Sequence, residues 1–491
     1  MYLLGLDIGT SSIKASVVEI ATSQCVASTQ FPDAETPITS LQTGWAEQSP
    51  ATWWEHAQAA ILKLNASRKY DPQQIQAIGI SYQMHGLVLV DKNKEVLRDS
   101  IIWCDSRAVE IGEQAFQSIG AEKCLSYLLN SPGNFTASKL AWVKKNEPEI
   151  YNRINKIMLP GDFIAMKLTG EITTSISSLS EGIFWDFKNN ELSHDVMQHF
   201  GFDQNHFPVI QDVFSNHGHL LSTVASTLSL KAGIPITYKA GDQPNNALSL
   251  NVLEPGEVAA TAGTSGVIYG VTDKITCDPQ SRVNTFAHVN HTPQTNRLGV
   301  LLCINGTGIM NSWVKNKIGA GLTYPEMNQQ ASQVAAGSDG LQTFPFGNGA
   351  ERIFNNKIIG AQFSKIDLNK HSHAHIFRAA QEGIAFTFRY GLDIMRSNGM
   401  QPNIIRAGHA NMFLSEVFTE AFVNATGVPV ALYQTEGSVG AAIGAGIGHH
   451  VYANAQEAFA QVKPIKTVTP TKEKMYNELY SNWLITLNKN L

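Results

Sequence analysis

The feature that most constrains the fold of this chain is a short turn that occurs twice between strand-like flanks. Residues 9–12 (Gly-Thr-Ser-Ser) lie between two apolar runs, and residues 263–266 (Gly-Thr-Ser-Gly) lie between similar runs 254 residues later (263 − 9), close to half of the 491-residue chain. Apolar runs joined by a short glycine-containing turn predict a β-hairpin. Either a common tripeptide recurs by chance, or the chain has two similar halves that each open with a hairpin.

Strand-like and helical stretches alternate along the rest of the chain. Strands are expected at 75–81, 234–241 and 402–408, and helices at 138–154, with Ser138 as the N-cap, and at 378–395. This alternation predicts layered α/β domains. A length of 491 residues predicts at least two of them.

Composition excludes several classes of partner and compartment. The net charge is −5, and no dense basic run is present, so a nucleic-acid partner is not expected. No apolar run approaches the length of about 18 residues that a membrane span needs, and Asp7 and Lys14 interrupt the N-terminal run, which predicts a strand and not a signal peptide. The five cysteines are scattered without a CxxC pair, which favours a reducing cytosol and no zinc or disulfide framework.

The turns indicate phosphate binding. Asp7 stands in a strand that is otherwise apolar, where a polar group is costly unless it is used. Glycine permits close backbone approach, and backbone N–H groups with hydroxyls suit an anion. A Walker A loop is absent from the sequence. Two such turns that face one cleft would hold a polyphosphate from both sides.

Asp242 follows the strand expected at 234–241 and precedes a predicted helix. This is the crevice position where α/β proteins bind ligands. The positive end of the helix dipole is expected to keep the carboxylate ionised. An ionised aspartate beside a substrate hydroxyl accepts its proton in phosphoryl transfer. The alternative is an aspartate that only caps the helix.

Two further stretches suit a sugar. Met84 and His85 stand at the end of the strand expected at 75–81, where a histidine is either a ligand contact or a structural hydrogen-bonding group. Trp103, Asp105 and Arg107 combine a ring for C–H faces with charged groups for hydroxyls. The alternative for the last two is a surface ion pair.

In their order along the chain, these residues resemble the FGGY family of carbohydrate kinases. The resemblance covers nearly the whole chain. It lies in the segments 7–14, 103–107, 135–148, 159–171, 241–243, 262–266, 382–386 and 435–446. It implies an α/β fold of two actin-like (ribonuclease H-like) ATPase domains with the active site in the cleft between them. A sugar-binding domain is expected at 1–246 and a nucleotide-binding domain at 255–491.

The resemblance also implies roles for individual residues. Asp242 matches the catalytic base, and Asp7 matches the aspartate that holds Mg²⁺ through water. The residues that match positions for ATP are Thr10, Ser11, Lys14, Gly263, Thr264, Ser265, Gly308, Gly408 and Asn411. The residues that match positions for the sugar are Met84, His85, Asp105, Arg107 and Asp242.

The form of residues 83–86 (Gln-Met-His-Gly) resembles the branch of the family that phosphorylates D-xylulose with MgATP. Two departures accompany this likeness. His409 interrupts the glycine run of the adenosine segment, and residues 177–180 (Ser-Ser-Leu-Ser) replace the usual Ser-Asp-Ala, so that an acid expected near the sugar is missing.

Other activities stay open at this point. Related kinases act on ribulose, gluconate, glycerol or a deoxysugar, and a catalytically silent ATP-binding sensor of the same fold is a further alternative. The chain starts at the first predicted strand, so the DNA-binding head of a sugar-responsive repressor is not expected. The expected partners are the sugar and MgATP in the cytoplasm, without nucleic acid or membrane, and a homodimer is an open alternative.

Overall fold

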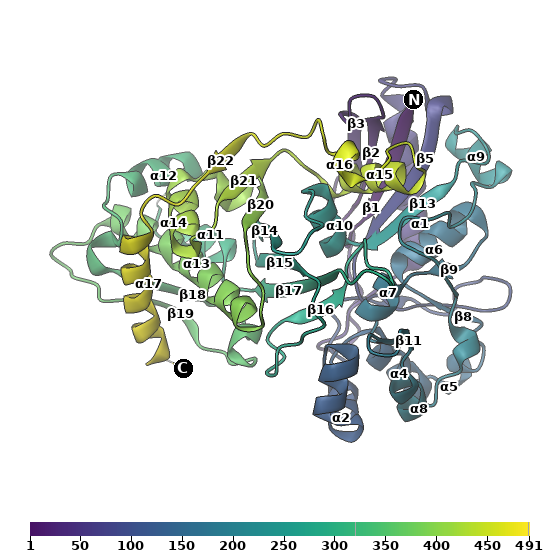
Figure 1. Cartoon of the computed structure of the whole chain (residues 1–491), viewed down its shortest axis with the longest axis horizontal. Coiled ribbons are helices and arrows are strands. Elements are labelled where there is room, and N and C mark those ends of the chain that lie inside the picture. The colour runs from purple at the N-terminus through teal and green to yellow at the C-terminus, as the bar shows by residue number, and fades with distance from the viewer. Residues whose placement is uncertain (320, 490) are drawn as a thin grey trace.

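The computed structural model describes residues 1–319, 321–489 and 491, and it contains two large β-sheets, each covered by helices (Figure 1). The first sheet has five strands in the order β13-β5-β1-β2-β3. Their bounds are β1 Tyr2–Ile8, β2 Ile13–Glu19, β3 Cys25–Phe31, β5 Ile75–Tyr82 and β13 Ile236–Gly241. β1, β5 and β13 run parallel, whereas β2 and β3 complete an antiparallel meander from β1.

The second sheet has seven strands in the order β16-β17-β15-β14-β20-β21-β22. Their bounds are β14 Glu257–Ala262, β15 Gly266–Thr272, β16 Asn284–Ala287, β17 Leu298–Ile304, β20 Ile404–Gly408, β21 Val430–Tyr433 and β22 Lys466–Val468. Strands β17-β15-β14-β20-β21 repeat the pairing pattern of the first sheet, because β14 pairs antiparallel with β15 and parallel with β20. Both predicted hairpins and the two-fold repeat are therefore confirmed.

Helices cover both faces of the first sheet. α1 (Pro50–Ala66) and α6 (Pro160–Thr169) share one apolar core with Leu4 and Leu6 of β1. Leu3, on the opposite face of β1, packs with Ala441 and Ala442 of α15 (Gly437–Gly448). Because both faces are covered, the central strands are apolar throughout.

The other helices are α2 Val109–Ile119, α3 Ala121–Lys123, α4 Thr136–Asn146, α5 Pro148–Tyr151, α7 Ile176–Glu181, α8 His194–Phe200, α9 Ser222–Leu228, α10 Asp242–Ser249, α11 Gly308–Lys317, α12 Tyr324–Ser332, α13 His373–Ser397, α14 Glu416–Thr426, α16 Ala455–Ala458 and α17 Glu473–Asn488. The short strand pairs are β4 Glu47–Gln48 with β7 Ser100–Ile101, β6 Val88–Val90 with β8 Lys156–Met158, β9 Thr173–Thr174 with β12 Val209–Ile210, β10 Trp185–Asp186 with β11 Glu191–Leu192, and β18 Gln342–Phe346 with β19 Gly360–Ser364.

Helix α15 crosses from the second half of the sequence to the first sheet. In Figure 1 the yellow helix α15 lies beside β1, β2 and β5, and α16 lies next to α15. The approach is close, because a Cβ atom on Gly5 would lie 1.9 Å from the carbonyl oxygen of Ser438, and one on Gly79 would lie 2.0 Å from that of Ala441. The predicted division into domains at 1–246 and 255–491 assigns α15 to the second domain, although α15 packs on the first sheet. The rest of the division stays a prediction.

The predicted strands and the long helix at 378–395 are confirmed, whereas the helix at 138–154 needs correction. α4 begins at Thr136 with Phe135 as its N-cap, and the Ser138 hydroxyl instead donates to the carbonyl of Pro132 over 3.2 Å. The helix ends before Pro148, since a proline disfavours helical backbone in the residue before it, and α5 starts there. Among the described residues, no helix is both long and apolar enough to span a membrane.

Candidate active site

Two aspartates lie at the carboxyl edge of the first sheet. Asp7 is the last residue but one of β1, and Asp242 is the first residue of α10, directly after β13. Because β1 and β13 both run parallel to β5, their carboxyl ends meet at one edge, the position where open α/β sheets bind ligands. Both side chains are half-buried, so a substrate can still reach them.

The electrostatics of Asp242 differ from the prediction. Burial, together with the nearby Asp7 carboxylate, raises the pKa of Asp242 to about 7. Desolvation therefore outweighs the helix dipole, which was expected to keep the group ionised. The capping alternative is also wrong, because Gly241 is the N-cap and Asp242 is already the first helical residue. A carboxylate with a pKa near 7 is suited to accept a proton.

Asp7 is enclosed by its own hairpin and by α15. It lies opposite Lys14 in the β1–β2 pairing, and the pKa of Asp7 is raised by burial although Lys14 opposes the shift. A Cβ atom on Gly437, the first residue of α15, would lie 2.5 Å from Asp7 Oδ2. The carboxylate therefore faces the N-terminus of this helix.

The two carboxylates fit a Mg²⁺ ion that is only partly held by protein. Among the described residues, no group of three or more His, Cys, Asp or Glu side chains is placed to enclose a metal. Mg²⁺ keeps several waters and usually binds through one or two carboxylates together with substrate phosphates. A divalent cation would also offset the cost of two desolvated carboxylates that lie close together.

A cavity of about 680 Å³ opens beside the second hairpin turn. Its walls come from that turn, from α11 and α12, and from the segment that leads into α14. The lining residues are Ala262, Gly263, Thr264, Gly308, Ile309, Asn311, Ser312, Tyr324, Pro325, Asn328, Gln329, Ser332, Asn411, Met412, Leu414, Ser415, Glu416 and Val417. The size and the mixed lining suit a nucleoside.

The turn is fixed to the start of α11. The Gly308 amide donates to the carbonyl of Gly263 over 2.9 Å, and the Ile309 amide donates to that of Thr264 over 3.0 Å. Asn411 lies across the turn, with its Nδ2 3.6 Å from the point where Gly263 would carry a Cβ.

Four of the residues predicted to bind ATP thus line one cavity, namely Gly263, Thr264, Gly308 and Asn411. Ser265 and Gly408 are close to them in sequence but do not line it. Thr10, Ser11 and Lys14 belong to the other hairpin.

Thr10 connects the first turn to the predicted sugar loop. Its hydroxyl donates to Gln83 Oε1 over 3.0 Å and accepts a hydrogen bond from the indole N–H of Trp103, also over 3.0 Å. A phosphate at this turn would therefore lie next to the loop that carries Met84 and His85.

His85 has a fixed orientation. Its Nδ1 lies 3.1 Å from the carbonyl oxygen of Glu181, so Nδ1 carries the proton and donates, and Nε2 is left as an acceptor. The ring packs edge-on against Phe135 and lies beside Phe286 of β16. Burial lowers the pKa of His85 to about 3, which keeps the ring neutral. Met84 is buried beside Gly241, next to Asp242.

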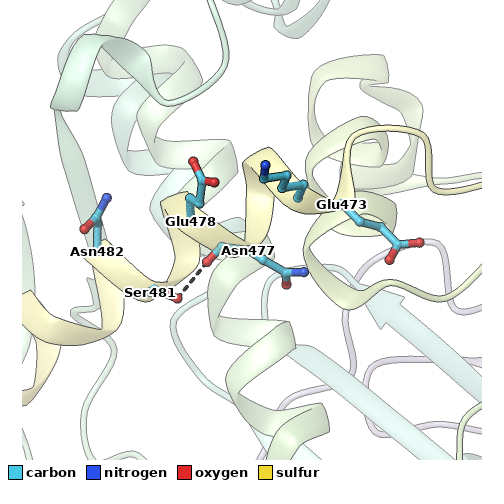
Figure 2. A pocket seen from close by; sticks show the side chains of 6 residues that line it. Glu473, Asn477, Glu478, Ser481 and Asn482 are labelled. Atoms are coloured by element: carbon cyan, nitrogen blue, oxygen red, sulfur yellow. Dashed lines mark hydrogen bonds between the residues drawn. The ribbon is translucent and has the colours of Figure 1, made fainter.

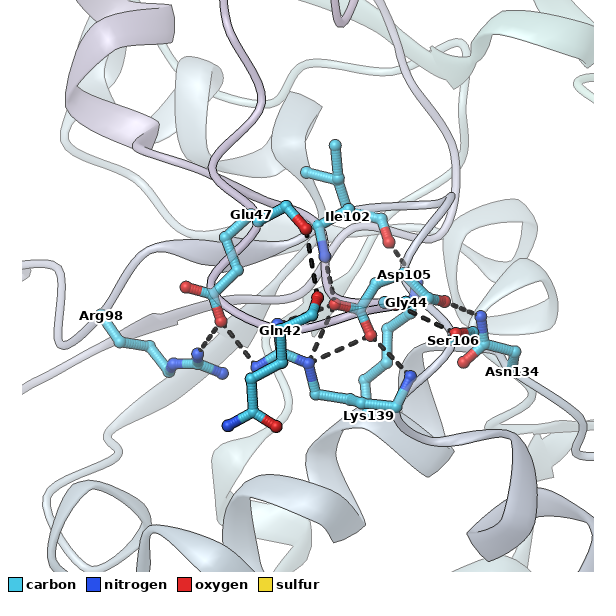
Figure 3. A network of polar contacts seen from close by, with 12 residues as sticks. Gln42, Gly44, Glu47, Arg98, Ile102, Asp105, Ser106, Asn134 and Lys139 are labelled. Atoms are coloured by element: carbon cyan, nitrogen blue, oxygen red, sulfur yellow. Dashed lines mark hydrogen bonds and ion pairs between the residues drawn. The ribbon is translucent and has the colours of Figure 1, made fainter.

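Asp105 and Arg107 form a buried ion pair below the loop that precedes them. Both side chains are buried and form an ion pair of 2.7 Å, and Arg107 also pairs with Glu47 over 2.6 Å and covers the ring of Trp45. The amide of Ala46 donates to Asp105 over 2.6 Å. Figure 3 shows this network around Asp105, Glu47 and Lys139. Because neither side chain is exposed, the surface ion pair is wrong, and the direct contact of Asp105 and Arg107 with the sugar stays a prediction.

Two residues near the sugar loop were not predicted from the sequence. Lys139 is fully buried, and its Nζ donates to the carbonyls of His85 and Ile102 over 2.8 and 2.9 Å. Glu181 is buried beside His85, one helical turn after Ser178, where the sequence lacks the expected acid. A carboxyl group three residues from an expected one is the signal that could have identified it.

The shallow depression along α17 is not a comparable site (Figure 2). It is lined by six side chains of this single helix, Glu473, Lys474, Asn477, Glu478, Ser481 and Asn482. Side chains from one exposed helix face do not converge on a ligand.

Comparisons with known proteins agree with this geometry. The model for the N-terminal domain of the FGGY family of carbohydrate kinases matches residues 2–249, and the model for its C-terminal domain matches residues 258–449. A xylulose kinase of Escherichia coli (strain K12) is 26% identical over 466 residues, which cover 94% of this chain and 92% of that protein.

Solved structures show the same fold. A xyloylose kinase from Brucella ovis superposes with a TM-score of 0.88 at 26% identity, covering 99% of this chain and 98% of that chain. A xylulose kinase from Rhodospirillum rubrum superposes with a TM-score of 0.89 at 25% identity, covering 100% of this chain and 99% of that chain. The expected two-domain ATPase fold is therefore confirmed, and the chain belongs to the FGGY family of carbohydrate kinases.

Proposed function

We propose that this kinase transfers the γ-phosphoryl group of ATP to O5 of D-xylulose and so forms D-xylulose 5-phosphate in pentose catabolism. The observation that carries the proposal is the position of Asp242, whose pKa is about 7, at the end of β13 beside Asp7 and Met84. The names of the relatives, xylulose kinase in Escherichia coli and Rhodospirillum rubrum, support the choice of sugar.

In the proposed reaction, the sugar lies against Met84 and His85, with one hydroxyl donating to His85 Nε2. Asp242 accepts the proton of the terminal hydroxyl. The electron pair left on the terminal sugar oxygen then forms a bond to the γ-phosphorus. The bond from that phosphorus to the β,γ-bridging oxygen breaks, and its electron pair leaves with ADP. Catalysis of this type depends on positioning and on charge stabilisation.

The two hairpin turns would share the nucleotide. Gly263, Thr264, Gly308 and Asn411 would hold the nucleoside end in the 680 Å³ cavity, and Thr10, Ser11 and Lys14 would face the phosphates from the first domain. Asp7 and Asp242 would hold Mg²⁺ through water, and the ion supplies charge neutralisation at the phosphates. The five cysteines are free thiols, which supports a cytoplasmic enzyme.

A substrate panel tests the proposal. Purified protein is assayed for ADP release with ATP, Mg²⁺ and each of D-xylulose, D-ribulose, gluconate, glycerol and a deoxysugar. The proposal expects the highest kcat/KM with D-xylulose. A higher value with another member of the panel assigns the enzyme to that sugar, and ADP release that no member of the panel stimulates contradicts a kinase for these sugars.

A further inference from the structure

Glu181, the last residue of α7, places its carboxyl group directly behind the sugar loop. The residue is 1% exposed. Its Oε1 accepts a hydrogen bond from the backbone amide of His85 over 3.3 Å. Its Oε2 lies 2.7 Å from the point where Gly241 would carry a Cβ, next to Met84, and has no hydrogen-bond partner among the described residues. The carboxyl group thus stands between the sugar loop and the residue that precedes Asp242.

His85 needs such support because its backbone is in an unfavourable conformation. Its φ is +63°, a region that residues other than glycine rarely occupy without compensating contacts. Glu181 binds both its amide and its ring, through Oε1 and through the backbone carbonyl. Lys139 binds its carbonyl from the other side over 2.8 Å. The amide, the ring and the carbonyl of His85 are therefore all held.

The helix that carries Glu181 is itself fixed to the second sheet. The Ser177 hydroxyl donates to the carbonyl of Ala287 over 2.9 Å, and the Ala287 amide donates to Ser180 Oγ over 2.9 Å. Ala287 lies in β16, whose Phe286 ring is 5.6 Å from the His85 ring. The serines that replace the expected acid motif thus anchor α7 on the second domain.

The charge of Glu181 suits a supporting role. Burial raises the pKa of Glu181 well above its ordinary value, and the nearby Asp242 and Asp162 add to the shift. A carboxyl group accepts a hydrogen bond from the His85 amide whether or not it carries a proton, and protonation lessens the negative charge beside Asp242.

We infer that Glu181 is a positioning residue that presents His85 Nε2 to the sugar, and that it takes the place of the acid missing from residues 177–180. This inference rests on the proposed function, because it requires His85 to contact the sugar. Glu181 does not touch the reacting atoms in this account and acts only through His85.

A double-mutant cycle tests the inference. Glu181→Met keeps the length of the side chain but removes the acceptor, and we expect the KM for the sugar to rise about tenfold while the KM for ATP is unchanged. Glu181→Gln keeps an acceptor for the His85 amide and is expected to restore the wild-type KM. In the His85→Ala background, Glu181→Met is expected to have no additional effect. Independent effects of the two substitutions, or an unchanged sugar KM, would overturn the inference.

A second measurement needs no sugar. Hydrogen–deuterium exchange at the His85 amide is expected to become faster in Glu181→Met and to stay slow in Glu181→Gln, and an equal rate in both overturns the inference. If Glu181→Met does not fold, Glu181→Ala replaces it. Glu382→Gln is the matched control, because Glu382 is also a buried carboxyl group but lies on α13, bound to Arg378, and is expected to leave the sugar KM unchanged. A wild type that phosphorylates no sugar contradicts only the proposed function, and the exchange rates still decide the role of Glu181.

Discussion

The carboxylate of Asp7, in the first strand of the chain, lies against Gly437, where the helix α15 begins. A Cβ atom at position 437 would be 2.5 Å from Asp7 Oδ2, closer than real contacts allow. The carboxylate therefore occupies the space that a side chain at 437 would need, and the positive end of α15 points towards it. Both halves of the sequence are needed to build this part of the site.

Gly437→Ala should displace the Asp7 carboxylate. We expect the Mg²⁺ concentration for half-maximal activity to rise about tenfold, which corresponds to the loss of roughly 1.4 kcal/mol of interaction. A Mg²⁺ titration at saturating ATP and sugar measures it, and the sugar KM serves as the internal control. An unchanged Mg²⁺ requirement would contradict the role of Asp7 in holding the metal.

Activity should depend on the ionisation of Asp242. Because the pKa of Asp242 is about 7 and the ionised form accepts the proton, kcat/KM for the sugar should fall tenfold per pH unit below about pH 7 and level off above it. A pH–rate profile from 5.5 to 8.5, measured at several Mg²⁺ concentrations and extrapolated to low Mg²⁺, measures this, because a bound cation lowers the pKa of a neighbouring carboxyl group. A flat profile across pH 7 contradicts the assignment.

Asp242→Asn should lower activity and at the same time raise stability at high pH. Turnover should fall by about 10²–10⁴-fold while sugar and ATP still bind. Folding raises the pKa of Asp242, so the protonated group contributes stability at low pH that is lost as the pH rises through about 7. The variant should therefore exceed the wild type in melting temperature by more at pH 8 than at pH 5. Turnover near the wild-type value would contradict the role of Asp242 as the proton acceptor.

Two glycines near the nucleotide cavity should respond differently to alanine. A Cβ on Gly308 would lie 2.2 Å from the carbonyl oxygen of Gly263 and would distort the turn, so Gly308→Ala should lower the melting temperature and raise the KM for ATP. A Cβ on Gly408 meets nothing within 4 Å, so Gly408→Ala should fold normally. An increase in the ATP KM of Gly408→Ala would then come from a clash with the nucleotide, and no increase would place Gly408 outside the site.

Arg107→Ala should affect stability and not sugar recognition alone. Arg107 is buried and pairs with Asp105 and Glu47, and removing one partner of a buried ion pair costs about 3–5 kcal/mol. Urea unfolding measures the loss. If the variant has normal stability and only its KM for the sugar has increased, the result would support a direct contact between Arg107 and the sugar.

The sequence predicted the local parts of this molecule well, because hairpins and single strands are determined by residues close together in the chain. The turns at 9–12 and 263–266 and the position of Asp242 after β13 are examples. Contacts between distant segments were missed, because apolar periodicity does not identify the partner of a face. The burial of the Arg107 side chain, the hydrogen bond from Lys139 to the carbonyl of His85 and the packing of α15 on the first sheet all depend on such contacts.

The crossing of α15 has a consequence for how the protein is made. Synthesis proceeds from the N-terminus, so β1 and β5 leave the ribosome long before residues 437–448 exist. Until then the face of the first sheet at Gly5 and Gly79 is not covered by α15, whose carbonyl oxygens lie nearest to a Cβ atom built at either glycine. Contacts of such long sequence separation form slowly. The carboxyl edge of the first sheet, where Asp7 meets the N-terminus of α15, is therefore completed only after residues 437–448 have been translated.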